Sequence, residues 1–241
     1  MTDTELPLPP WRRGVQKRTR PARPALSQAQ IVDAGLRIVA EEGIEAVSMR
    51  RIAAVFGTGA SSLYAHVANK EELLALMFDR ICGDVVVPTP EPARWQEQIK
   101  EMARSGHAVM TRHNDIARAA LATVPSGPNA LRVSEGMLAI LLAGGVPPEV
   151  AAWALDRLFL YLVADAYESS LHAQAAAGRG VGEAEMSEAF RDQLNGYFES
   201  LPADRFPNLR AHARAMTSGR QDERFEFGLD LLIDGVARYA A

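Results

Sequence analysis

The chain has 241 residues, 48% of them hydrophobic, and a formal net charge of −4 at pH 7. This length is enough for one small and one larger domain with a sizeable buried core. The single cysteine, Cys82, excludes an intramolecular disulfide, and the sequence has neither a long apolar run nor a secretory start. We therefore expect a cytoplasmic protein without a membrane partner, and the composition implies no catalytic class.

The N-terminal segment concentrates positive charge. Residues 1–80 contain eleven Lys and Arg against nine Asp and Glu, whereas the remainder contains fifteen against twenty-one. Six of the eleven cations precede the first predicted helix and are interleaved with prolines: Arg12, Arg13, Lys17, Arg18, Arg20 and Arg23. We predict that residues 1–26 form a disordered basic arm attracted to DNA phosphates or to a narrow minor groove. A solubilising tail is the alternative.

The first helix begins at a strong capping signal. Ser27 and Gln30 form a capping box, and Gly43 ends the helix. The apolar row of this helix consists of Ile31, Ala34, Gly35 and Ile38. We expect this row to pack across the next two helices.

Residues 48–74 contain three helix starts separated by short turns. Ser48 caps a helix whose inward side chains are Ile52, Ala53 and Phe56. The glycine-containing turn at residues 57–59 has a length typical of a helix-turn-helix, and a short helix is predicted from Ala60 to His66. That helix would be roughly 10 Å long, which suits a major groove about 12 Å wide.

A third helix is predicted from Glu71 to about Asp84, after a capping-box-like start at Asn69 and Glu72. Its inward side chains are Leu73, Leu74, Met77 and Ile81. Lys70 lies at the first helical position, where the helix dipole disfavours a cation unless a phosphate lies nearby. We therefore predict that this helix begins at DNA and connects residues 27–85, the DNA-binding domain, to the rest of the chain.

Two motifs resemble a known family. Residues 27–74 resemble the DNA-binding domain of the tetracycline-repressor (TetR) family, whose LYxHFxxK-like signature corresponds here to Leu63 through Lys70. Phe225 through Val236 are similar to the last helix of the tetracycline repressor's own subfamily. The resemblance implies a homodimer packed as a four-helix bundle and a small-molecule effector bound inside the helical domain.

We predict two groups of DNA contacts. Phosphates are contacted by the helix starts at Ser48 and Asn69, by the basic arm, and by Arg50, Tyr64 and Lys70. The residues expected to contact base edges have short or hydrogen-bonding side chains: Ala60, Ser61, Ser62 and His66. The expected DNA is a palindromic operator, because a twofold dimer places two reading segments about one DNA turn apart.

Residues 91–241 are predicted to form a helical effector-binding and dimerisation domain after a proline-rich break, which makes the fold all-α. The expected helices are Trp95–Thr111, Ile116–Ala122, Ala130–Leu142, Pro148–Ala177, Glu183–Ser200 and Glu223–Tyr239. Residues 202–219 fit either a helix or a long loop.

Two of these helices have more apolar surface than one core absorbs. A helix that is apolar on two faces is either central in its domain or shared with a partner. We therefore expect a homodimer. Its predicted interface comprises Leu155, Leu158, Leu162, Phe225, Leu229, Leu232 and Val236.

The effector pocket is predicted among apolar, aromatic and polar residues of the second domain. The candidates are Trp95, His107, Met110, His113, Trp153, Phe159, Tyr161 and Tyr167. A metal site is not expected, because the six-residue spacing of His107 and His113 does not place them on one helical face. The run 119–125 aligns with the tetracycline repressor's magnesium-binding histidine but has alanine in that place, so the resemblance implies another planar or hydrophobic effector, such as an antibiotic or a natural product.

No enzyme motif occurs: the sequence lacks a phosphate loop, a nucleophile elbow and metal-ligand pairs. We predict a ligand-responsive transcriptional regulator without a cofactor, most simply a repressor released from its operator by a small hydrophobic molecule. The alternative is a DNA-binding regulator that has no small-molecule effector and is controlled by a protein partner. Cys82 is expected to be a small core residue, with a sensor thiol as the alternative.

Overall fold

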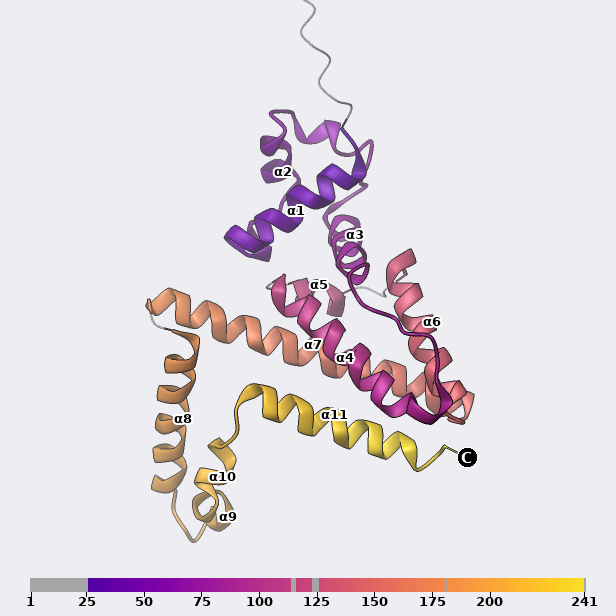
Figure 1. The fold of residues 1–241 in the computed structure, drawn as a ribbon. Helices are drawn as coiled ribbons and strands as arrows, with labels where there is room; N and C mark the ends of the chain where they lie inside the picture. Colours follow the sequence, from indigo (N-terminus) through magenta and orange to yellow (C-terminus); the bar gives the residue numbers. More distant parts are fainter. Residues whose placement is uncertain (1–25, 114–115, 123–125, 181, 241) are drawn as a thin grey trace, which may run out of the picture.

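The computed structural model describes residues 26–113, 116–122, 126–180 and 182–240. Within those ranges the regular structure is entirely helical, which confirms the all-α prediction. A small N-terminal unit lies at the top of Figure 1, above a larger helical body. The predicted basic arm at residues 1–26 lies outside the described residues, apart from Leu26.

The N-terminal unit contains α1 (Gln28–Glu42), η2 (Ile44–Ala46), α2 (Met49–Val55) and η3 (Ala60–Ser62). The capping box is present: the Ser27 backbone N–H donates to Gln30 Oε1 at 3.0 Å, and the Gln30 N–H donates to Ser27 Oγ at 3.3 Å. The predicted apolar row of α1 is buried. α1 lies close to the third predicted helix at Gly35, where an added Cβ would lie 2.7 Å from the Met77 sulfur.

The second part of the helix-turn-helix differs from the sequence prediction. Residues 60–62 form a 3-10 turn, and hydrogen-bonded turns follow up to residue 66, where a regular helix was expected. The backbone N–H groups of Ser62, Leu63 and His66 donate to carbonyls three residues earlier. Leu63 and Val67 are both buried, and the Val67 N–H donates to the Leu63 carbonyl four residues earlier.

α3 (Lys70–Cys82) joins the two parts of the molecule. The Asn69 side chain caps it, because Asn69 Oδ1 accepts a hydrogen bond from the Glu72 N–H at 2.7 Å. Leu73 and Met77 are fully buried, and Phe78 and Ile81 continue the buried face toward the body. The helix therefore has one end in the DNA-binding unit and the other in the second domain.

The body confirms the predicted helices to within about two residues at each end. Its elements are η4 (Pro92–Arg94), α4 (Trp95–Arg112), α5 (Ile116–Ala122), α6 (Pro128–Ala143), α7 (Pro148–Arg179) and α11 (Gln221–Ala237). α7 and α11 run side by side (Figure 1).

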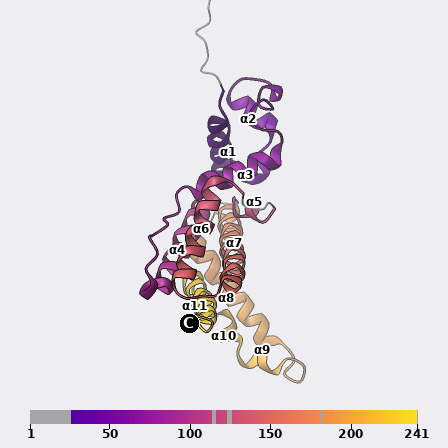
Figure 2. The ribbon, with the colours of Figure 1, turned by 90° about the vertical axis from the view of Figure 1, so that its right-hand side faces the viewer.

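α8 (Glu183–Ser200), α9 (Pro207–Ala211) and α10 (Ala213–Thr217) form an extension from the end of α7. Residues 202–219, for which the sequence fits either a helix or a long loop, contain the two short helices α9 and α10. Figure 2 shows an elongated molecule with the helix-turn-helix at one end and α9 at the other. None of the helices in the described part of the chain is long and apolar enough to cross a membrane.

Candidate DNA-binding and effector-binding sites

The predicted DNA-contacting residues occupy the open side of the N-terminal unit. Tyr64 is 54% exposed. Arg50, Ser48, Ser61 and Ser62 are also exposed, whereas Ala60, His66 and Lys70 are half-buried. Among residues 48–70, the large apolar or aromatic side chains that are exposed are Val55 and Tyr64. This surface fits contact with phosphates and base edges.

Hydrogen bonds hold this surface in place. The Gln28 side chain on α1 donates to the His66 carbonyl at 3.1 Å. This bond connects the end of residues 60–66, which we call the reading segment because they include the predicted base contacts, to α1. The hydroxyls of Thr58 and Ser62 lie 2.8 Å apart across the turn. Ser48 is occupied as the N-cap of α2, since its Oγ accepts from the Arg51 N–H at 3.1 Å. Arg51 forms an ion pair with Glu42 on α1. The adjacent Arg50 does not share this ion pair.

A cavity of about 290 Å³ lies between α3, α4, α6 and α7. Such a volume is near the lower end of the range for small-molecule sites. The lining residues extend over more than eighty positions of the sequence. They are Phe78, Ile81, Cys82, Val85, Gly106, Val109, Met110, Ala130, Val133, Ser134, Met137, Leu155, Asp156, Phe159 and Leu162. Met110 and Phe159, two of the predicted pocket residues, line this cavity.

The other six predicted pocket residues do not line it. Trp95 packs against Gly144, where an added Cβ would lie 2.3 Å from the indole Cγ. Trp153 is 62% exposed on α7. His113 is half-buried at the end of α4, and burial lowers the pKa of its imidazole. The remaining three, His107, Tyr161 and Tyr167, fall on α4 and α7 outside the lining, because only one side of each helix faces the cavity.

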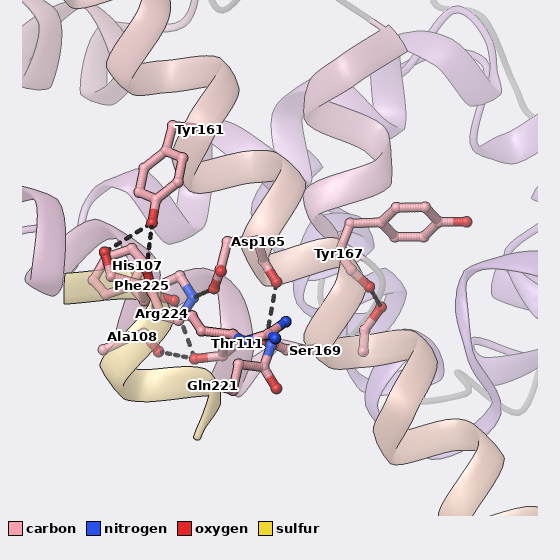
Figure 3. A network of polar contacts seen from close by, with 11 residues as sticks. His107, Ala108, Thr111, Tyr161, Asp165, Tyr167, Ser169, Gln221, Arg224 and Phe225 are labelled. Atoms are coloured by element: carbon pink, nitrogen blue, oxygen red, sulfur yellow. Dashed lines mark hydrogen bonds and ion pairs between the residues drawn. The ribbon is translucent and has the colours of Figure 1, made fainter. Parts of the chain in front are cut away.

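His107 and Tyr161 belong instead to a network that joins α4, α7 and α11 (Figure 3). His107 Nε2 lies 2.7 Å from Asp165 Oδ2, and its ring stacks on Phe225 with centroids 4.3 Å apart. The Tyr161 hydroxyl donates to the Phe225 carbonyl at 2.7 Å, and burial raises the pKa of Tyr161 to about 12. Tyr167 points away from this network (Figure 3). The histidine is therefore held by a carboxylate inside the fold.

Four of the predicted interface residues are buried inside the protomer: Leu158, Leu162, Phe225 and Leu229. This corrects the prediction, because such side chains contact the chain's own core. Leu155, Leu232 and Val236 are half-buried, and Leu155 lines the cavity. The large apolar side chains exposed on α7 and α11 are Trp153, Leu160, Leu171, Phe227 and Leu231. A helix that is apolar on all sides does not reveal from its sequence which side its own domain covers.

Two residues that the sequence did not single out connect α3 to α6. Asp79 on α3 accepts hydrogen bonds from the backbone N–H groups of Asn129 and Ala130, both at 2.9 Å, and from the Asn129 side chain at 3.1 Å. Arg132 on α6 donates to the carbonyls of Cys82 and Val85, both at 3.0 Å. Each helix thus caps the other, and we call these contacts the Asp79–Arg132 clamp.

The sequence contains one indirect signal for this clamp. α6 begins at Gly127 and Pro128, so its N-cap has no side chain that could accept a hydrogen bond. An added Cβ at Gly127 would lie 2.2 Å from Asp79 Oδ1, so glycine is required for the aspartate to approach. The acceptor comes from elsewhere in the chain, and only the fold identifies it as Asp79.

Cys82 lies in the cavity wall. Burial, with a smaller contribution from the charge of Asp79, raises the pKa of its thiol to about 12. The thiol is therefore protonated at neutral pH and behaves as a small apolar group, which supports the core interpretation over the sensor.

A helix-turn-helix unit, a connecting helix and a helical domain with an apolar cavity together define a DNA-binding transcriptional regulator. Two family models match the chain in the same order. Residues 31–77 match "Bacterial regulatory proteins, tetR family", and residues 87–239 match "Tetracyclin repressor-like, C-terminal domain". The chain belongs to the tetR family of bacterial transcriptional regulators, and it is not an enzyme.

Known proteins resemble this chain over nearly its whole length. The transcriptional repressor DrrR1 of Streptomyces coeruleorubidus is 32% identical over 232 residues, which cover 94% of this chain and 82% of DrrR1. Apo ActR of Streptomyces coelicolor is 43% identical with a TM-score of 0.80, covering 90% of this chain and 97% of ActR. ActR in complex with actinorhodin has the same identity and a TM-score of 0.81, covering 91% and 99%.

Proposed function

We propose that this chain is a cytoplasmic homodimeric repressor that binds a palindromic operator and is released by a small, mainly apolar effector. One observation carries the proposal: α3 supplies Phe78, Ile81 and Cys82 to the cavity wall and begins at Lys70 beside the DNA-contacting surface. A molecule in the cavity therefore contacts the helix that supports the reading segment. Repression is inferred by analogy with DrrR1, which is named a repressor.

The proposed DNA contacts follow from exposure and charge. Arg50, Tyr64 and Lys70 contact phosphates, together with the starts of α2 and α3. Ala60, Ser61, Ser62 and His66 approach base edges with short or hydrogen-bonding side chains. Because these side chains are small, we expect modest discrimination at each base pair, and a dimer that reads two half-sites compensates for this.

The proposed dimer interface consists of the apolar side chains exposed on α7 and α11. Phe227 and Leu231 are 65% and 59% exposed, and they lie four residues apart on one side of α11. Trp153 and Leu160 are exposed on α7, which runs alongside α11. Exposed aromatic and aliphatic side chains on paired helices are typical of a self-association surface.

The Asp79–Arg132 clamp provides a route from the cavity to the DNA-binding unit. Val133 and Met137 on α6 line the cavity, as do Phe78 and Ile81 on α3. Because the clamp joins the C-terminal end of α3 to the start of α6, an effector that displaces α6 also moves α3. An ion pair between Arg118 on α5 and Glu45 on η2 is a second connection between the two parts. About 3 kcal/mol of coupling would weaken DNA binding roughly 150-fold.

The effector is proposed to be a natural product or antibiotic. ActR, which shares 43–44% identity with this chain, has been solved in complexes with actinorhodin and with (S)-DNPA. Alanines 119 and 120, in the run that aligns with the tetracycline repressor's histidine, are buried here and offer no metal ligand. We therefore propose an effector other than magnesium-tetracycline.

The first experiment is a gel-shift titration of purified protein with DNA upstream of its own coding region and of the nearest divergent neighbour. Saturable, salt-sensitive binding to one palindromic fragment, released by an apolar compound, is expected. Failure to bind any fragment above competitor DNA would contradict the proposal. Specific DNA binding with no thermal shift from a broad set of apolar compounds would favour control by a protein partner.

A further inference from the structure

We propose that Ser134 recognises the effector by donating a hydrogen bond to a carbonyl oxygen carried on a flat aromatic body. This inference rests on the proposed function, because it takes the cavity between α3, α4, α6 and α7 as the effector site. It adds the chemical class of the effector and the residue that fixes its orientation.

Ser134 lies within an apolar stripe on α6. Four residues of this helix line the cavity: Ala130, Val133, Ser134 and Met137. Residues spaced three, four and seven positions apart share one side of a helix, so these four form a single stripe that faces the cavity. Apolar side chains precede and follow Ser134 along the stripe. Its hydroxyl therefore belongs to the cavity wall rather than to an end of α6.

The Ser134 hydroxyl has no hydrogen-bond partner among the described residues. Serines on α7 behave differently, because the hydroxyls of Ser169 and Ser170 donate to the carbonyls of Asp165 and Tyr167 on their own helix. Ser134 is half-buried, and a donor that is sheltered from water without an acceptor costs free energy. Donors without a partner are also rarer in proteins than acceptors with a spare lone pair. A ligand that satisfies Ser134 is therefore expected to supply an acceptor.

The other polar side chains of the lining are less suited to this role. The Cys82 thiol is protonated at neutral pH and is only a weak donor. Asp156 lies on the side of α7 that also carries Trp153 and Leu160, which belong to the proposed dimer interface. Among the described lining residues, Ser134 is thus the hydroxyl donor, and its helix lies outside that interface.

Two aromatic rings define the shape of the ligand. Phe78 and Phe159 line the cavity from α3 and α7, with an edge-to-face arrangement and ring centroids 6.3 Å apart. Aromatic faces and edges of this kind pack well against a flat aromatic molecule. Apolar sites commonly orient such a body with a small number of polar groups. The cavity therefore suits an aromatic ketone or quinone whose oxygen is directed to Ser134.

The test compares 9-fluorenone with fluorene, which has the same three-ring skeleton but no carbonyl oxygen. Dissociation constants of both probes are measured by equilibrium dialysis in the absence of DNA. Ser134→Ala is expected to weaken fluorenone binding about fivefold and to leave fluorene binding within about twofold of wild type. Ser187→Ala is the matched control, because it removes a half-buried helical hydroxyl from α8 outside the cavity and should change neither affinity.

The ratio of the two dissociation constants separates recognition from packing. An equal loss of both probes in Ser134→Ala would overturn the inference, because the hydroxyl would then act on the cavity and not on the carbonyl. Unchanged fluorenone binding in Ser134→Ala would overturn it as well. Failure of wild type to bind either probe would also overturn it, because the cavity would then not accept a flat aromatic ketone.

The gel shift distinguishes this inference from the proposed function. Operator binding that is released by an apolar compound equally well in wild type and in Ser134→Ala would leave the proposed function intact and reject only the role of Ser134. Fluorenone binding that depends on Ser134, without binding to any operator, would reject the proposed function and leave the ligand recognition standing.

Discussion

The DNA-binding unit and the effector domain place their functional residues in opposite ways. In the first, residues 48–70 contain every predicted contact outside the basic arm, and local caps and turns position them. In the second, the cavity is lined by four helices whose contributing residues extend from Phe78 to Leu162. A contact surface can thus be built by local structure, whereas a cavity depends on how distant helices pack.

The two regions also use apolar surface differently. The N-terminal unit buries its apolar row completely and exposes polar groups. The effector domain leaves an apolar space between its helices, and Phe227 and Leu231 remain exposed on α11. α3 and the Asp79–Arg132 clamp join these two regions. Variants at the clamp, at the exposed side chains of α11 and at the predicted DNA-contacting residues therefore test the connection and each region separately.

The largest effect is expected at the clamp. Asp79→Ala leaves the N–H groups that open α6 without their acceptor in a buried site, and it should lower the free energy of unfolding by about 3 kcal/mol. Thermal or urea unfolding measures this loss. Asp84→Ala is the matched control, because it removes an exposed carboxylate next to the same helix end and should change stability by less than about 0.5 kcal/mol. Equal effects of the two changes would show that the clamp does not hold α3 to α6.

The next effect concerns self-association. Phe227→Glu with Leu231→Glu should raise the dimer dissociation constant by at least about 30-fold, because two charges would enter an apolar contact. Sedimentation across a range of concentrations measures it. Tyr197→Glu on α8, where the tyrosine is 60% exposed, serves as the control and should leave the dimer intact. A double variant that stays dimeric at all concentrations would place the interface elsewhere.

A smaller effect is expected at the DNA surface. Lys70→Ala should weaken binding to all sequences by about 1 kcal/mol and reduce the salt slope by about one. Ser61→Ala or His66→Ala should instead alter which operator is preferred. Arg238→Ala at the end of α11 removes a cation far from this surface and should leave the salt slope unchanged. A Lys70 variant that alters sequence preference but not the salt slope would show that the two groups of contacts are assigned incorrectly.

The smallest effect at neutral pH concerns Cys82. Its folded pKa is about 12, above the ordinary thiol value near 9, so the folded chain holds the proton more tightly than the unfolded chain. Stability is therefore unaffected below about pH 8 and falls as pH rises through about 9 to 12. Cys82→Ala should reduce that fall, as measured by urea unfolding at several pH values. Rapid alkylation of native Cys82 at pH 8 would contradict a protonated, buried thiol.

Part of this molecule was predictable from its sequence because the signals are local. Ser27, Ser48 and Asn69 cap helices as expected, and the long amphipathic segments of the second domain became helices with nearly the predicted bounds. The prediction for the segment after Gly59 was wrong in detail, because residues 60–62 form a 3-10 turn and hydrogen-bonded turns follow up to residue 66 where a regular helix was expected. Helical periodicity does not distinguish a 3-10 turn from an α-helix over so few residues.

The sequence by itself determined the all-α class, because caps, turns and periodicity act between near neighbours, and its two motifs identified the family; the residues that contact DNA stay a prediction. Only the tertiary structure decided that Met110 and Phe159 line the cavity while His107 pairs with Asp165, and that Leu229 is core while Phe227 is exposed. It also brought Asp79 to the start of α6. These choices depend on how each helix is rotated against its neighbours, and that rotation is set by the packing of the whole domain.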